Sequence, residues 1–166
     1  MDESVGFLIS LAFTSFERAL ASELKKKCPE ATPAQWKILM LVGNGRFKTA
    51  AELADFLDCD TAAITRILDR LEAKRLVKRV RSKVDRRLVN LSLTGEGKKI
   101  LPHLPEVSVS VMNELLKDFS GMDVERLKLY LRRIIWNGGS SRQEGPTPEV
   151  KFAPEALGRK KKDTSR

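Results

Sequence analysis

The sequence predicts a mainly α-helical fold with a small β-hairpin wing: a winged helix-turn-helix joined to dimerisation helices from both ends of the chain. Three observations support this prediction. Thr49 and Glu52, three residues apart, form a capping box that begins a short helix. Asp60 is a suitable N-cap for a second helix soon after it. Residues 77–81 and the alternating segment 89–93 then have the pattern of two paired strands, the second of them half-buried.

The second helix of this pair has two different faces. Its apolar residues recur at the spacing of one buried stripe: Ile64, Ile67, Leu68 and Leu71. The opposite face bears Ala62, Thr65, Arg66, Asp69 and Ala73. Threonine can contact a thymine methyl group and arginine can reach guanine, as residues in a DNA major groove do. The residues expected there are Thr61, Ala62, Thr65 and Arg66. An ordinary amphipathic surface helix fits the periodicity equally well.

The hairpin region is strongly basic. Between positions 74 and 87 the acidic residue Asp85 is outnumbered by Lys74, Arg75, Lys78, Arg79, Arg81, Lys83, Arg86 and Arg87. So much like charge on a two-stranded ribbon is self-repelling unless a polyanion is its partner. The wing residues expected to contact DNA are Arg81, Lys83, Arg86 and Arg87, with Arg86 or Arg87 in the minor groove. A solvated basic loop is the alternative, which the adjacent helix pair disfavours.

Several segments together resemble the MarR family of bacterial transcription regulators. They are Thr32–Trp36, Ile64–Glu72, Asp85–Arg87 and Leu91–Gly95, in the order that the family has them. The resemblance covers roughly residues 5–137. It implies that Asp85 braces Arg87 within the wing. One position departs from the pattern, because Arg75 stands where the family commonly has a glycine that tolerates a left-handed turn.

The expected domain organisation follows from the helical patterns on either side of the hairpin. A domain at 1–137 would contain the winged helix, 32–94, and dimerisation helices at 4–27 and 95–137. Pro102 and Pro105 predict a kink or a fresh helix start between 101 and 105. The terminal helices carry more apolar surface than one small layer needs, which predicts an intertwined homodimer and a near-palindromic operator. Residues 138–166 have the composition of a disordered basic tail.

Composition narrows the possible partners and compartments. The net charge of +9 favours double-stranded DNA as partner before any membrane. Cys28 and Cys59 lie far apart in expected loops, which favours a reducing cytoplasm and neither a disulfide nor a zinc site. The apolar run 5–13 is too short to span a membrane. His103 is the sole histidine, and we find no catalytic, metal-binding or cofactor motif.

The resemblance also implies a small effector, an aromatic carboxylate or a phenolic compound, bound between the dimer helices and the winged domain. Residues that could line such a pocket are Phe13, Phe16, Arg18, Trp36 and His103. Each has a plainer interpretation. Trp36 fits core packing, Arg18 an exposed ion pair, and His103 a surface or hinge position. Redox sensing through Cys59 is disfavoured, because the peroxide-sensing branch of the family carries its cysteine near the start of the first helix.

The function expected from these patterns is sequence-specific DNA binding by a ligand-responsive repressor that acts as a dimer. Two other classes remain open. A winged-helix protein-interaction module would have only non-specific nucleic-acid affinity. An enzyme acting on nucleic acid would need a carboxylate cluster of metal-binding spacing, which the sequence does not show.

Overall fold

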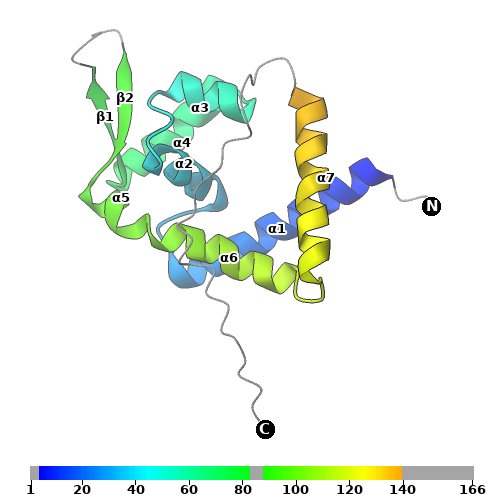
Figure 1. Ribbon diagram of the computed structural model, residues 1–166. Coiled ribbons are helices and arrows are strands. Elements are labelled where there is room, and N and C mark those ends of the chain that lie inside the picture. Colours follow the sequence, from blue (N-terminus) through cyan, green and yellow to red (C-terminus); the bar gives the residue numbers. More distant parts are fainter. Residues whose placement is uncertain (1–3, 83–87, 140–166) are drawn as a thin grey trace. The chain divides into compact units, whose positions relative to one another are not determined.

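The computed structural model describes residues 4–82 and 88–139 (Figure 1). Its described part is mainly helical with one two-stranded antiparallel sheet, as the sequence predicts. The elements are α1 (Val5–Lys27), α2 (Pro33–Gly43), α3 (Ala50–Leu57), α4 (Thr61–Ala73), β1 (Val77–Arg81), β2 (Val89–Leu93), α5 (Gly95–Ile100), α6 (His103–Leu115) and α7 (Gly121–Gly139). Two units are distinguished, one ending at Leu115 and one beginning at Leu116, and each is described by itself.

The first unit is built around α2. The Thr32 side chain accepts a hydrogen bond from the Gln35 N–H at 3.4 Å, and the Gln35 side chain accepts one from the Thr32 N–H at 3.2 Å. This capping box, with Pro33 at the first helical position, fixes where α2 begins. Ile38 and Leu39 are almost fully buried, so the helix has core on more than one side.

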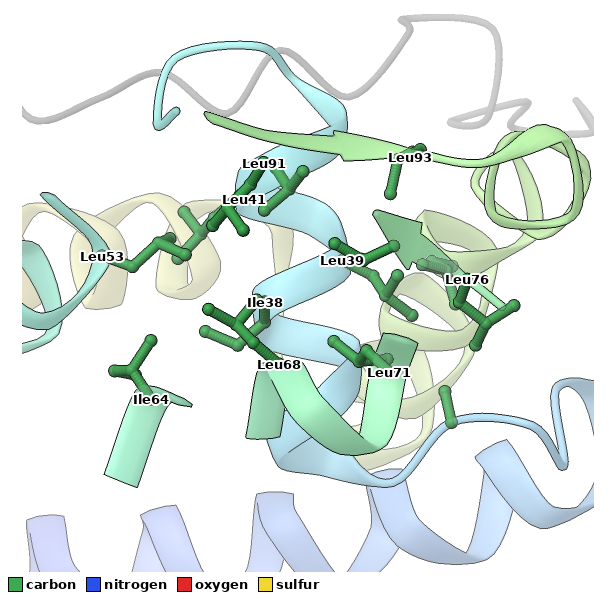
Figure 2. Packing of buried hydrophobic residues seen from close by; sticks show 14 of the residues in the cluster. Ile38, Leu39, Leu41, Leu53, Ile64, Leu68, Leu71, Leu76, Leu91 and Leu93 are labelled. Carbon is green, nitrogen blue, oxygen red and sulfur yellow. The ribbon is translucent and has the colours of Figure 1, made fainter. Parts of the chain in front are cut away.

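Figure 2 shows how that core is assembled around the α2 side chains. Leucine and isoleucine side chains of α3, α4 and the hairpin converge on α2 from different directions. They include Leu53, Ile64, Leu68, Leu71, Leu91 and Leu93, all of them buried. Burying such side chains contributes roughly 1.5–3 kcal/mol each relative to leaving them exposed. The core therefore holds both helices of the helix-turn-helix and the base of the wing in one packed unit.

The hairpin is buried only at its base. Val77 pairs with Leu93 and Arg81 pairs with Val89, in antiparallel register. Leu93 is buried, whereas Val89 is 41% exposed. The expectation that β2 is half-buried along its whole length is therefore wrong at its distal end. The wing projects beyond the core there, so the apolar-polar alternation marks a strand but overestimates the depth of its burial.

Two prolines shape the connection that follows the wing. The Thr94 side chain accepts a hydrogen bond from the Gly97 N–H at 3.1 Å and caps α5. The helix stops at Ile100, and α6 begins at His103, one residue past Pro102. This confirms the predicted fresh start in this stretch, because a proline cannot supply the amide hydrogen bond that would continue the preceding helix.

Helix α1 combines a buried end with an exposed end. Leu20 and Leu24 are buried in the core, but apolar side chains of the first half lie at the surface. These exposed residues are Val5, Phe7, Leu8, Ile9, Leu11 and Phe13. By length and hydropathy alone, this 23-residue helix would suffice to cross a membrane. Only 6% of its apolar window is buried within the structure.

In the second unit, the described structure is mainly the helix α7. Ser120 and Asp123 form a capping box: the Asp123 N–H donates to Ser120 Oγ at 3.2 Å, and the Ser120 N–H donates to Asp123 Oδ2 at 3.1 Å. The helix continues to Gly139, past residue 137, where the dimerisation helices are expected to end. Its exposed apolar residues are Met122, Leu129, Tyr130, Leu131, Ile134, Ile135 and Trp136.

Candidate nucleic-acid interface

A tight turn positions α4 after α3. Asp58 ends α3 in the left-handed conformation, with φ 48°, and the Cys59 N–H donates to the Ala54 carbonyl at 3.0 Å. Aspartate tolerates that conformation better than most residues. Asp60 then caps α4, accepting a hydrogen bond from the Ala62 N–H at 3.2 Å. The turn is therefore held at both of its ends by aspartates, and the predicted N-cap at Asp60 is confirmed.

The two faces of α4 are separated as the periodicity predicts. Ile64, Leu68 and Leu71 are buried, with exposed fractions of 2% or less. On the other side Thr61, Ala62 and Arg66 are exposed and Thr65 is half-buried. A helix that is anchored by three core residues presents a small N-terminal surface bearing two threonine hydroxyls and one long cation. That surface has the size and chemistry of a helix that reads base edges.

The wing is joined to α4 by ion pairs of Arg79 in β1. The Arg79 Nη2 atom lies 2.7 Å from Asp69 Oδ1, and Nη1 lies 2.6 Å from Glu72 Oε2. The Arg79 N–H also donates to Glu72 Oε1 at 3.3 Å. These carboxylates raise the pKa of the Arg79 guanidinium, Asp69 most strongly. Arg79 thus differs from the free cation that the basic hairpin suggested, because its charge is directed at α4.

Sequence reasoning missed this role of Arg79. Asp69 and Glu72 lie three residues apart on one face of α4, but Arg79 lies beyond the helix, where helical spacing gives no information. The available signal was chemical. Two carboxylates on a surface that is expected to approach phosphates need a cation to neutralise them. The chain reverses after α4, and this brings β1 back toward these carboxylates.

The helix-to-wing joint departs from the family pattern in sequence but still makes a left-handed turn. Arg75 has φ 57°, in the left-handed region where a glycine is usual. Hydrogen bonds hold it there: the Arg75 N–H donates to the Glu72 carbonyl at 2.8 Å, and the Leu76 N–H donates to the Leu71 carbonyl at 2.9 Å. The Thr94 hydroxyl donates to the Arg75 carbonyl. The joint is therefore retained, and the free-energy cost of the left-handed conformation is borne by the Arg75 backbone.

Another predicted basic residue also serves the fold. The Lys74 Nζ atom donates to the Glu30 carbonyl at 2.8 Å and to Gln35 Oε1 at 2.9 Å. Gln35 is a buried polar side chain, 4% exposed, and this contact helps to satisfy it. Lys74 thereby ties the C-terminus of α4 to the start of α2.

Of the predicted wing contacts, Arg81 lies at the distal end of β1 and is exposed. It shares a face of the hairpin with Arg79, since alternate strand residues point to the same side. Lys78 precedes Arg79 in the strand and is directed to the opposite side. Lys83, Asp85, Arg86 and Arg87 lie outside the described residues.

The residues expected to line an effector pocket have separate surroundings. Trp36 is half-buried and its indole N–H donates to the Leu104 carbonyl at 2.9 Å. The Phe13 ring is exposed, with Lys37 Nζ 5.7 Å from its centroid. Phe16 is half-buried against the core and Arg18 is exposed.

His103, the last of these residues, is exposed at the start of α6. Its Nδ1 atom lies 3.8 Å from Glu106 Oε2. A groove of about 500 Å³ lies elsewhere, between α1 and α6, and includes none of the five expected residues. It is lined by polar side chains that include Ser22, Glu23, Lys26 and Ser110.

The two cysteines have different environments. Cys28 is buried at the end of α1, and burial raises the pKa of its thiol above the ordinary value. Cys59 is exposed in the turn before α4. Within residues 4–82 and 88–139, no cluster of histidine, cysteine or carboxylate side chains has the grouping needed to hold a metal ion.

The fold and this surface define a winged helix-turn-helix protein. Residues 31–89 match the family model described as MarR family. The multiple antibiotic resistance protein MarR of Escherichia coli is 32% identical over 107 residues, 64% of this chain and 74% of that protein. The chain belongs to the MarR family of transcription regulators.

Two further comparisons agree with this assignment. The transcriptional regulator SarZ of Staphylococcus aureus is 36% identical over 77 residues, which is 46% of this chain and about half, 52%, of SarZ. A crystal structure of a MarR mutant from E. coli complexed with operator DNA has a TM-score of 0.71 and 30% identity. That match covers 79% of this chain and 93% of the other.

Proposed function

We propose that this protein is a sequence-specific DNA-binding repressor in which α4 reads the major groove. The observation that carries this proposal is the exposed N-terminal surface of α4, with Arg66 and Thr65 beside a basic wing and a buried stripe behind them. The related MarR of E. coli has been crystallised with operator DNA. In the proposed complex Thr61, Ala62, Thr65 and Arg66 contact bases, while Arg81 and Lys83 contact phosphates.

Selection of bound sequences from a random duplex pool tests this function. The proposal predicts a near-palindromic consensus, because a two-fold dimer places two recognition helices about 34 Å, one turn of DNA, apart. Recovery of no consensus at moderate ionic strength would instead indicate an interaction module with non-specific nucleic-acid affinity. Incubation of the selected duplex with Mg²⁺ is expected to leave it uncut, since regulators of this family act by binding.

The dimer is the second part of the proposal. The first half of α1 exposes Val5, Phe7, Leu8 and Phe13, and α7 exposes an apolar series of its own. Apolar surface of this extent is uncommon on a monomer in water. A second copy of the chain would cover both surfaces, as the symmetry of a palindromic operator requires.

A membrane is the weaker explanation of the same surface. Leu20 and Leu24 are buried in the core and Phe16 packs against it, so the continuously exposed stretch that carries the apolar side chains of α1 is residues 5–15. Eleven residues of helix span roughly 16 Å at 1.5 Å per residue, short of a hydrocarbon layer of about 30 Å. A cytoplasmic location follows from this and from DNA as partner.

A matched pair of variants tests the dimer. Leu8→Glu places a charge on the apolar face of α1, whereas Ser10→Glu places the same charge two residues away, on the other side of the helix. Sedimentation equilibrium should show dimers for the wild type and for S10E and a shift toward monomers for L8E. A monomeric wild type would contradict the dimer.

The effector is the third part. We propose a small aromatic carboxylate or phenolic compound that favours a dimer unable to match the operator spacing. The family membership supports it, together with the aromatic and cationic character of Phe13, Phe16, Arg18, Trp36 and His103. Calorimetry with a panel of aromatic acids tests it. The absence of binding, or binding that leaves operator affinity unchanged, would overturn this part alone.

A further inference from the structure

We infer that Arg79 is a positioning residue for DNA recognition: it neutralises two carboxylates on the recognition helix and fixes the wing to that helix through the same contacts. The inference deepens the proposed function and rests on it. Its basis is the geometry of Arg79 with Asp69 and Glu72, all of which lie within the first unit.

The first step concerns the face on which the carboxylates lie. Asp69 and Glu72 follow Arg66 at helical intervals of three residues, so they continue the surface that starts at Thr61 and Ala62. Their side chains are 57% and 42% exposed. Unneutralised carboxylates on a surface that approaches phosphates would oppose binding. The Arg79 guanidinium, 29% exposed, lies against both.

The second step concerns orientation. Glu72 is engaged twice by Arg79, through the guanidinium at 2.6 Å and through the backbone N–H at 3.3 Å. The contact therefore fixes the main chain of β1 as well as its side chain. Asp69, one helical turn earlier, holds the other guanidinium nitrogen. Paired contacts of a planar fork restrict direction more than a single point charge does.

The third step is that the constraint is local to one side of the wing. Arg79 pairs with Leu91, which is buried, whereas Arg81 pairs with Val89, which is exposed. The last anchored side chain of β1 on the helix-facing side is thus Arg79, and the described apolar residues beyond it, Val80, Leu88 and Val89, are all exposed. The angle at which Arg81 is presented depends on the contact of Arg79 with α4.

The test compares variants of equal charge on the two sides of β1. Arg79→Gln and Lys78→Gln each remove one positive charge, but Lys78 points away from the Arg79 side. Each is measured against the selected duplex and a scrambled duplex. K78Q should weaken binding to both duplexes by a similar factor. R79Q should weaken binding to the selected duplex by on the order of tenfold more than binding to the scrambled one, because positioning contacts affect specific binding most.

Two further variants separate neutralisation from positioning. Arg79→Lys keeps the charge without the fork, and should restore affinity for the scrambled duplex but only part of the preference for the selected one. The triple variant D69N/E72Q/R79Q removes all three charges, and should also restore affinity for the scrambled duplex while the preference stays low. Thermal unfolding confirms that each variant is folded, and R79K serves if R79Q is not.

Equal behaviour of R79Q and K78Q on both duplexes, or full preference in the triple variant, would overturn the inference while leaving the proposed function intact. A wild-type protein with no preference between the two duplexes would overturn the proposed function, and the inference with it. The two failures are therefore distinguished by the wild-type measurement alone.

Discussion

The carbonyl oxygen of Leu76 lies so close to the α-carbon of Gly97 that a β-carbon at position 97 would meet it at 2.0 Å. Leu76 belongs to the joint between α4 and the wing, and Gly97 to the first turn of α5. The chain entering the wing thus crosses directly over the chain leaving it, and the crossing is closed by the bond from the Thr94 N–H to the same Leu76 carbonyl at 3.1 Å.

Gly97→Ala should therefore destabilise the protein strongly. The obstructing atom is backbone and cannot move aside, so we expect a loss of about 3 kcal/mol, at the upper end of overpacking costs. Gly95→Ala is the matched control, because a β-carbon there meets nothing within 4 Å. Urea unfolding of both variants measures the difference. Similar stability of G97A and the wild type would contradict this crossing.

Arg75→Gly should leave stability unchanged or raise it by up to about 1 kcal/mol, since glycine adopts a φ of 57° without the cost borne by other residues. The greater freedom of glycine in the unfolded chain offsets part of this gain. Arg75→Ala removes the same side chain but keeps the β-carbon. If R75G proved less stable than R75A in urea unfolding, the left-handed conformation of Arg75 would be wrong.

Arg66→Ala should cost about 1–3 kcal/mol on the selected duplex and relax sequence preference, whereas Lys83→Ala should weaken all DNA alike. Arg66 is exposed on α4, whereas the DNA contact of Lys83 is expected from the sequence alone. Fluorescence anisotropy with selected and scrambled duplexes measures both effects. Equal losses on the two duplexes for R66A would contradict its role as a base contact.

The cysteines should differ in reactivity. Cys59 is exposed and should be alkylated readily, while Cys28, 2% exposed and with a raised pKa, should react only as the protein unfolds. Because the folded state keeps the Cys28 proton that the unfolded chain releases, the stability it provides falls as the pH rises above the ordinary thiol pKa. Mass spectrometry after timed alkylation at pH 7 and pH 9 measures the reactivity of each cysteine. Rapid modification of Cys28 in folded protein would contradict its burial.

Local sequence signals predicted the elements well because the stabilising interactions lie within a few residues. The caps at Thr49 and Asp60 both have the predicted hydrogen-bonding partners or positions. The proline at 102 likewise separates two helices as its chemistry requires.

Contacts between elements were harder to foresee. The basic residues near the hairpin have the same charge in the sequence, yet Arg79 binds α4 and Lys74 binds the start of α2. That distinction depends on where the chain returns after the left-handed turn at Arg75, which periodicity does not encode. The residues expected to line the effector pocket share only an aromatic or cationic character in the sequence, and Trp36 and His103 have partners of their own.

The most direct test compares wild-type affinity for the selected palindrome with affinity for the same duplex after one half-site is scrambled, at a fixed moderate ionic strength. A dimer that reads both half-sites through α4 should prefer the intact site by about a thousandfold. Equal affinity for the two duplexes would contradict sequence reading by α4.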